Sequence, residues 1–170
     1  MGNSVALPSK MAGVAKKFEG RTFGVVGCTG RMGSGIATLC VSQGLKTLVA
    51  SRSKDKAERF AKELNSQAGE ELARGCSHEE LLAAKPTMTY LAMDAFAIEG
   101  FVKEHREKLE GLCLGEMTAW FAAERYMGKR PCPKPHVTTL TYFQSLCPEA
   151  KWVKCWQSVM SSSIANNKKQ

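Results

Sequence analysis

The sequence predicts a single α/β domain with a doubly wound, parallel β-sheet covered by helices on both faces. Three observations predict it. Short apolar segments typical of β-strands alternate along the chain with segments of helical periodicity. A glycine-rich turn joins the first of these strands to the first helix. The 170 residues, 44% of them hydrophobic, suffice for one domain with a sizeable core.

The expected strands are apolar, β-prone segments, and they lie at residues 22–26, 45–50, 72–76, 88–93, 112–114 and 152–156. The third is the weakest, because the sequence between Asn65 and Ser77 is polar and contains glycine. The expected helices cover residues 36–41, 55–65, 78–84, 95–109 and 137–146. Ser77 and Glu80 have the spacing of a capping box, and Gly44 marks the end of the first helix.

The domain is expected to span residues 21–160, preceded by a lead-in at residues 1–20 and followed by a polar tail at residues 161–170. The segment 118–135 is the least regular, with three prolines within five residues. It is interpreted as a connecting loop that is long for a compact domain, and therefore as a candidate contact surface for other protein subunits.

Composition excludes several classes of function. The net charge of +8 is dispersed, and no RNA-binding aromatic motif or helix-turn-helix pattern accompanies it, so no nucleic-acid partner is expected. No run of 18 apolar residues predicts a transmembrane segment. Seven cysteines without a CxxC pair indicate a reducing intracellular compartment, either the cytoplasm or an organelle interior. No metal site is expected, because Cys132 and His136 lack a second ligand pair.

Gly27, Gly30 and Gly33 are spaced three apart between a strand and a helix. In Rossmann-type dinucleotide-binding units, the first glycine allows a sharp turn and the second lets the backbone approach the pyrophosphate. The third lets helix and strand pack closely. The helix start then offers N–H groups and a positive dipole to the anion. The alternative is a glycine-rich turn kept only for close packing.

The step after the second strand indicates which dinucleotide is bound. NAD sites usually carry an acidic residue there for the ribose 2′-hydroxyl, whereas this chain has Ser51 and Arg52. A guanidinium and a hydroxyl suit a phosphate dianion, so NADP(H) is expected rather than NAD(H). An alternative role for the neighbouring Ser53 or Asp55 is to cap the next helix.

Residues 25–33 and 50–53 together resemble the deazaflavin-dependent NADP oxidoreductase family. They are also similar to the N-terminal oxidoreductase domain of the six-transmembrane metalloreductases. The likeness continues through residues 90–93 and 142–154. It implies a Rossmann-type fold that holds NADP(H). It also implies that the pyrophosphate is contacted by Thr29, Gly30, Arg31 and Met32, and the 2′-phosphate by Ser51 and Arg52. The path of the rest of the cofactor would be lined by Ala92 and Met93.

The chain departs from that family on the nicotinamide side. Residues 116–120 read Glu-Met-Thr-Ala-Trp where the family has a step such as Asp-x-x-Asn-Pro, and residues 155–159 read Cys-Trp-Gln-Ser-Val where the family usually has an Asn. The family's C-terminal strands and helices are also expected to be lacking. The catalytic residues therefore stay unknown. Two functions remain open: an NADP(H)-binding domain or subunit of a reductase, or a non-catalytic structural subunit of a larger assembly that has lost nucleotide binding.

The remaining polar residues indicate no second active site. The histidines, His78, His105 and His136, are far apart in the sequence. The carboxylates expected to be solvated helix charges are Asp94, Glu99 and Glu104. Cys28 lies near a helix start that would lower a thiol pKa, or it is a small residue tolerated in a tight turn. Trp152 and Trp156 are either anchors for a partner or residues that pack under the last helix.

Overall fold

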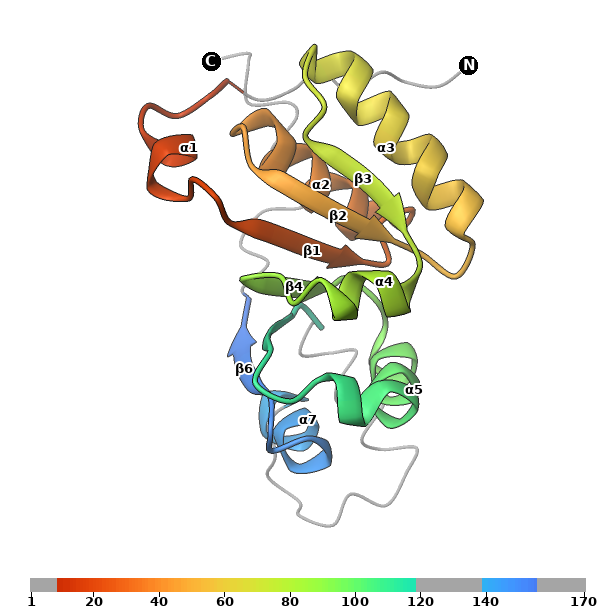
Figure 1. Ribbon diagram of the computed structural model, residues 1–170. Helices are drawn as coiled ribbons and strands as arrows, with labels where there is room; N and C mark the ends of the chain where they lie inside the picture. The colour runs from red at the N-terminus through yellow and green to blue at the C-terminus, as the bar shows by residue number, and fades with distance from the viewer. Residues whose placement is uncertain (1–8, 119–138, 156–170) are drawn as a thin grey trace, which may run out of the picture.

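The structure, a computed structural model, describes residues 9–118 and 139–155. Six strands form one sheet in the order β3-β2-β1-β4-β5-β6, and every neighbouring pair is parallel. The strands are β1 (Thr22–Val26), β2 (Lys46–Ala50), β3 (Ala73–Cys76), β4 (Met88–Leu91), β5 (Cys113–Glu116) and β6 (Lys151–Lys154). The chain starts at the centre, winds outward to β3, and then crosses back to build β4 to β6 on the other side of β1 (Figure 1). This is the strand order of a doubly wound Rossmann-type fold, as the sequence predicted.

Helices cover the sheet. They are α1 (Val14–Lys17), α2 (Arg31–Ser42), α3 (Lys54–Ala68), α4 (His78–Ala83), α5 (Ala95–His105) and α7 (Thr139–Leu146), with a 3-10 turn η1 (Arg106–Lys108). Helices α2 and α3 pack with Val25 of β1, whereas α4, α5 and α7 pack in a second cluster with Val26. Because successive strand side chains point to opposite faces, β1 is buried between two layers of helices.

Strand β3 shows why the sequence marked it only weakly. The side chain of Asn65 on α3 accepts hydrogen bonds from the Leu72 and Ala73 N–H groups and donates one to the Ala73 carbonyl. A Cβ at Gly75 would lie 2.3 Å from the Cα of Glu58, so α3 packs almost directly on the strand backbone. The polar residue and the glycine that obscured the strand are therefore the ones that attach it to the helix.

Other elements differ from prediction at their ends. The strand predicted at 88–93 ends at Leu91, because Asp94 caps α5 through a 2.9 Å hydrogen bond from the Ala97 N–H. The helix predicted to reach residue 109 ends at His105 and continues only as η1. The capping box of Ser77 and Glu80 at α4 is confirmed.

Helix α1 lies in the lead-in, where the sequence predicted no helix. Its neighbours hold it to the domain: the rings of Phe18 and Phe23 meet edge to face at 5.4 Å, and the Met11 N–H donates to the Gln43 side chain at 2.7 Å. The N-terminal residues from Ser9 onward therefore pack on the domain rather than simply leading into the first strand.

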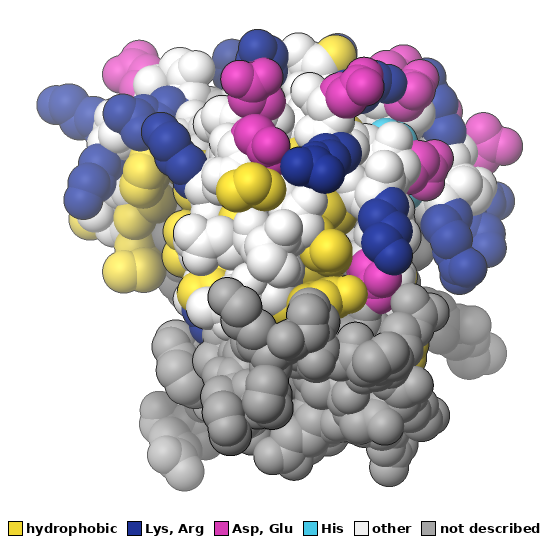
Figure 2. All heavy atoms as spheres, turned by 90° about the horizontal axis from the view of Figure 1, so that it is seen from below, with side chains coloured by type: hydrophobic (Ala, Val, Ile, Leu, Met, Phe, Trp, Pro, Cys, Tyr) yellow, Lys and Arg dark blue, Asp and Glu magenta, His cyan; other side chains and the backbone are white. Residues whose placement is uncertain are grey.

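Several predictions fall on residues that the structure does not describe, namely most of the loop 118–135, Trp120, Trp156 and the tail 161–170. Within the described ranges, no helix is both long and apolar enough to cross a membrane. On the face shown in Figure 2, basic and acidic side chains of the described residues are interspersed over much of the surface.

Candidate functional site

The carboxyl ends of β1 and β4 meet where the winding of the sheet reverses direction. In open parallel sheets, ligands bind in the crevice outside the strands at such a point. Gly27 directly follows β1, and Ala92 and Met93 directly follow β4. The structure therefore brings the first glycine of the turn together with two residues that lie 65 and 66 positions further along the chain and that the resemblance assigned to the same site.

Gly27 lies in close contact with the ends of three strands, β1, β2 and β4. Its φ of 84° lies in the left-handed region that favours glycine, and a Cβ there would lie 2.5 Å from the Ala92 carbonyl oxygen and 2.9 Å from Met93 Cγ. Its N–H donates to the Ala50 carbonyl, at the end of β2, at 2.9 Å. A side chain at this position would push apart β1 and β4.

The other two glycines differ in their surroundings. A Cβ at Gly33 would lie 2.2 Å from the Gly27 carbonyl oxygen, so the first turn of α2 rests directly on the glycine turn. A Cβ at Gly30 would meet only that same oxygen, at 3.3 Å. Gly33 is thus required for the close packing of α2 on the turn, whereas Gly30 faces open space at the N-terminus of α2.

The N-terminus of α2 is suited to an anion. Gly30 is its N-cap residue and supplies no side-chain cap, and the first turn contains no acidic residue. Thr29, Gly30 and Arg31 are exposed, and Met32 is half-buried. The N–H groups and positive dipole end of a twelve-residue helix therefore lie at the carboxyl end of β1 without a competing carboxylate from that turn.

Ser51 and Arg52 follow β2, but only the side chain of Arg52 is exposed to a ligand. The Ser51 hydroxyl is buried and closed into its own turn, since it donates to the Ser53 carbonyl at 2.7 Å and accepts from the Ser53 N–H at 3.3 Å. Arg52 is exposed, and among the described residues it forms no ion pair. Ser53 caps α3, as the sequence suggested, by accepting from the Lys56 N–H. Ser51 thus shapes the turn that presents Arg52.

Cys28 is not an activated thiol. It is fully buried, and burial, reinforced by the neighbouring Cys76, raises the pKa of its thiol to about 11. The possibility that the helix start lowers this pKa is therefore wrong, because the cost of burying a thiolate outweighs the effect of the helix. Cys28 is the small residue of a tight turn.

Away from the glycine turn, the structure corrects the prediction for Glu99, brings two histidines together and decides between the two alternatives for Trp152. Glu99 is not solvated: it is 4% exposed, and its carboxylate bonds Lys103 on the next turn of α5. His78 and His105, distant in sequence, have ring centroids 5.9 Å apart. Trp152 packs under α7, stacked on Phe143 with its indole N–H donating to the Cys147 carbonyl.

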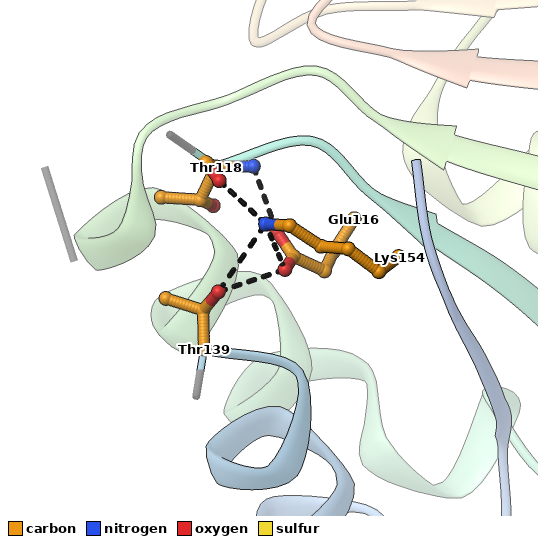
Figure 3. A network of polar contacts seen from close by, with 4 residues as sticks. All are labelled: Glu116, Thr118, Thr139 and Lys154. Carbon is orange, nitrogen blue, oxygen red and sulfur yellow. Dashed lines mark hydrogen bonds and ion pairs between the residues drawn. The ribbon is translucent and has the colours of Figure 1, made fainter. Parts of the chain in front are cut away.

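A buried polar network at the ends of β5 and β6 was missed from the sequence (Figure 3). Glu116 is fully buried, and its carboxylate accepts from Lys154 Nζ at 2.5 Å, from the Thr139 hydroxyl at 2.8 Å and from the Thr118 N–H at 2.7 Å. Lys154 also donates to the Thr118 carbonyl at 2.5 Å. The sequence shows only a carboxylate at the end of one strand and a lysine at the end of the next, which does not by itself predict that the two side chains meet.

Metal binding has no support in the described ranges, where no group of three or more histidine, cysteine or carboxylate side chains could hold an ion. The site is therefore a glycine turn, an uncapped helix start and an exposed arginine, arranged along the carboxyl ends of β2, β1 and β4.

Residues 22–100 match the family model described as 3-hydroxyacyl-CoA dehydrogenase, NAD binding domain. The fold is that of a dinucleotide-binding Rossmann domain. This Rossmann domain is similar to NAD(P)-dependent dehydrogenases and reductases. No curated protein matches the chain in sequence.

Of the similar solved structures, an imine reductase shares the fold, and two lactate dehydrogenases match at lower TM-scores. An imine reductase from Bacillus cereus is 17% identical with a TM-score of 0.58, and the match covers 83% of this chain and 42% of that one. A lactate dehydrogenase from a Medee basin deep-sea metagenome is 19% identical, with a TM-score of 0.48 and coverages of 64% and 42%. A minor L-lactate dehydrogenase from Enterococcus mundtii is 18% identical, with a TM-score of 0.47 and coverages of 66% and 43%. The Rossmann domain thus spans less than half the length of each.

Proposed function

We propose that this chain binds NADP(H) through the glycine turn and Arg52, as the cofactor-binding part of a reductase related to the deazaflavin-dependent NADP oxidoreductases. The observation that carries the proposal is the N-terminus of α2, which has no side-chain cap and follows Gly27 at the ends of β1 and β4. The family model matched by residues 22–100 is named for NAD binding, which supports a dinucleotide as the ligand class.

The residues fit the cofactor in parts. The pyrophosphate would lie against Gly30 and the first turn of α2, where backbone N–H groups and the helix dipole attract an anion. Ala92 and Met93, half-buried beside Gly27, would line the path of the cofactor past β4. When bound, NADP(H) supplies hydride-transfer chemistry, whereas these residues hold and orient it.

Arg52 carries the preference for the phosphorylated dinucleotide. Its guanidinium is exposed at the end of β2, one strand from the glycine turn, and Ser51 fixes the backbone that presents it. A guanidinium offers a planar set of N–H donors that matches the oxygens of a phosphate. The ribose 2′-hydroxyl of NAD(H) gives it no such charge partner, so NADPH is favoured.

Calorimetric titration of the purified chain with NADPH and NADH tests this proposal. We expect NADPH to bind more tightly, and the Arg52→Ala variant to lose about 10- to 100-fold in NADPH affinity while its NADH affinity changes little. Arg59→Ala is the matched control, since Arg59 is exposed on α3 and its removal changes the net charge equally. Equal binding of the two dinucleotides by the wild-type chain would contradict the role of Arg52.

A structural subunit that has lost nucleotide binding is the second candidate. It is favoured by the sheet edge: among the described residues β6 is the outermost strand, and Val153 on it is 42% exposed. The backbone groups along an edge strand are a surface on which a partner chain can pair. The same titration separates the candidates, because this one predicts that neither dinucleotide binds.

A further inference from the structure

We propose that the surface around α1 binds membranes that carry anionic lipids. This surface lies at the amino ends of the strands, since α1 precedes β1 and Ala15 on it lies close to Gly44, just before β2. Membrane binding there is separate from the proposed function, which concerns the carboxyl ends of the strands. Three observations carry it: a cluster of exposed cations, an apolar side chain exposed next to them, and contacts that hold both on the domain.

Basic side chains that the sequence shows as dispersed come together at this end of the molecule. The segment 9–21 contains four of them and one carboxylate, Glu19. A fifth is Lys46 on β2, which lies in register with Thr22 at the start of β1. In Figure 2, basic side chains gather at the left, the side on which Figure 1 places α1. The five cations, all exposed, form the α1 surface: Lys10, Lys16, Lys17, Arg21 and Lys46.

An apolar side chain is exposed next to these cations. Met11 is 68% exposed, the highest fraction among the large hydrophobic side chains of the described residues. Its neighbours Ala12 and Gly13 are exposed and small, so they do not hold Met11 away from a flat surface. Peripheral membrane proteins combine these two features, because cations attract anionic headgroups while an apolar side chain enters the boundary of the acyl chains.

The segment that carries Met11 is fixed on the domain. The Gln43 side chain, at the end of α2, accepts a hydrogen bond from the Met11 N–H at 2.7 Å and donates one to the Ser9 carbonyl at 3.0 Å. Further along the segment, the ring of Phe18 meets that of Phe23 on β1. The α1 surface is therefore ordered before it binds, and little conformational freedom is lost on binding.

The charge of the α1 surface suffices for reversible binding to an anionic bilayer. The two carboxylates beside the five cations are Glu19 and Glu70, which pairs with Lys10 at 3.1 Å, and together these seven residues leave a net charge of +3. Within the described residues, the other four cations form no ion pair. Each basic residue near an anionic bilayer strengthens binding about fivefold, so three net charges give about a hundredfold.

Lysines make up most of the cluster, which favours a lipid surface over an acidic protein. Four of the five cations are lysines, and Arg21 is the single arginine. A lysine ammonium is a point charge on a flexible stem and needs no partner of fixed geometry, whereas arginine suits carboxylates held in fixed positions. Headgroups in a fluid bilayer have no fixed positions, so the lysines match them better than they match a folded acidic partner.

Co-sedimentation of the purified full chain with lipid vesicles tests the proposal. We expect the chain to bind vesicles of phosphatidylcholine with about 30% phosphatidylserine, and not to bind vesicles of phosphatidylcholine alone. Raising the salt concentration from about 0.05 M to about 0.5 M should weaken the binding about tenfold or more, because salt screens exposed charges.

Charge reversal on α1 locates the binding surface. Lys16→Glu with Lys17→Glu should weaken binding to the anionic vesicles about 100-fold or more. The matched control is Lys56→Glu with Lys62→Glu: both lysines are exposed on α3, and their reversal changes the net charge equally. This control should bind within about threefold of the wild-type chain, since α3 lies more than a screening length from the proposed contact.

The apolar contribution is tested separately by Met11→Gln. This variant keeps every charge and should weaken binding to the anionic vesicles about tenfold. Thermal unfolding of all variants should match the wild type, because the substituted side chains are exposed. Lys16→Ala with Lys17→Ala supplies a milder variant of the same surface if the charge-reversed protein does not fold.

A loss confined to the α1 variants supports the proposal. It is overturned if the wild-type chain does not bind anionic vesicles, or binds phosphatidylcholine vesicles equally well. It is also overturned if the α1 and α3 variants lose binding equally, since total charge rather than this surface would then drive association. NADPH titration of the same proteins decides the proposed function independently, because no residue of the α1 surface belongs to the dinucleotide site.

Discussion

Two glycines of the turn differ in the space around them, so we expect a side chain at one to disturb packing and a side chain at the other to disturb binding. Gly33 faces the Gly27 carbonyl oxygen at a distance that no Cβ tolerates, whereas Gly30 faces only the same oxygen at 3.3 Å. We expect Gly33→Ala to lower the free energy of unfolding by about 2 kcal/mol, because α2 must move away from the turn. Gly30→Val should change it by less than about 1 kcal/mol, since φ −80° and ψ 162° suit valine. Urea denaturation measures both.

The binding effect of Gly30→Val should be far larger than its effect on stability. The valine side chain would occupy the space in front of the α2 N-terminus where the pyrophosphate is proposed to lie. We therefore expect NADPH binding to be abolished in a protein that stays folded. Unchanged NADPH binding by the valine variant would mean that the glycine turn serves packing only.

Individual residues could be predicted from the sequence where local spacing decides their role. The glycine spacing and the exposed Arg52 are of this kind, because a strand, a turn and a helix in succession place them. The inward hydroxyl of Ser51 depends on the conformation of one turn, which no residue pattern specifies. Glu99 was mispredicted because a charged residue on a helix is usually solvated, whereas here its face of α5 is buried.

Helices α4 and α5 share an aromatic cluster that contains two histidines. His78 at the start of α4 meets Phe101 and His105 of α5 edge to face, with ring centroids 5.2 and 5.9 Å away. Burial, and then the nearby His105, hold the pKa of His78 below its ordinary value of 6.5, although Glu104 raises it in part. The Nε2 atoms of both histidines are buried without a hydrogen-bond partner among the described residues, and that of His105 lies 3.9 Å from a carboxylate oxygen of Glu104.

This pairing of helices predicts a pH-dependent stability. The pKa of His78 is lower in the folded chain than in the unfolded chain, so between these two values the unfolded chain binds more protons. The stability that neutral His78 contributes is therefore full above about pH 6.5 and is lost as pH falls toward the folded pKa. Urea denaturation at pH 7.5 and 5.5 should show a lower free energy of unfolding at pH 5.5.

The His78→Phe variant is the control for that pH dependence, because it keeps an aromatic ring against Phe101 and cannot titrate. Its stability should change less between the two pH values than that of the wild-type chain. The pKa values of Glu79, Glu80 and Glu149 are lowered from their ordinary value of 4.5, so the effect of these carboxylates on stability lies below the range from pH 5.5 to 7.5. An equal loss of stability in wild type and variant would contradict the assignment to His78.

Whole elements were predictable to the extent that they bury a continuous apolar pattern. Strands β1 and β2 and helix α3 do so and were placed close to their observed bounds. Strand β3 was placed only weakly, because Asn65 and Gly75 attach it to α3 by hydrogen bonds and close backbone approach rather than by apolar side chains. The end of α5 was overestimated, since the apolar spacing continues through Leu109 while the backbone tightens into η1.

At the scale of the whole molecule, each half of the sheet is organised differently. The half from β3 to β1 is joined to α2 and α3 by apolar packing and by the glycine turn. The half from β4 to β6 has in addition the Glu116 and Lys154 network, which links β5, β6 and the start of α7. No local pattern could predict that network, because its two charges are 38 residues apart and meet only through the register of β5 against β6.

Removing one charge of the network should destabilise the whole domain. Lys154→Met leaves Glu116 fully buried with its negative charge uncompensated, and breaking a buried ion pair in this way typically costs 3–5 kcal/mol. Because Lys154 is itself one-quarter exposed, at 25%, we expect a loss near the lower end, about 3 kcal/mol, measured by urea denaturation. The double variant Glu116→Gln with Lys154→Met should lose less than Lys154→Met alone, since no buried charge is then left without a partner. A double-mutant cycle with additive losses would show that the two charges stabilise the domain independently, and would contradict the network as the element that holds β5, β6 and α7 together.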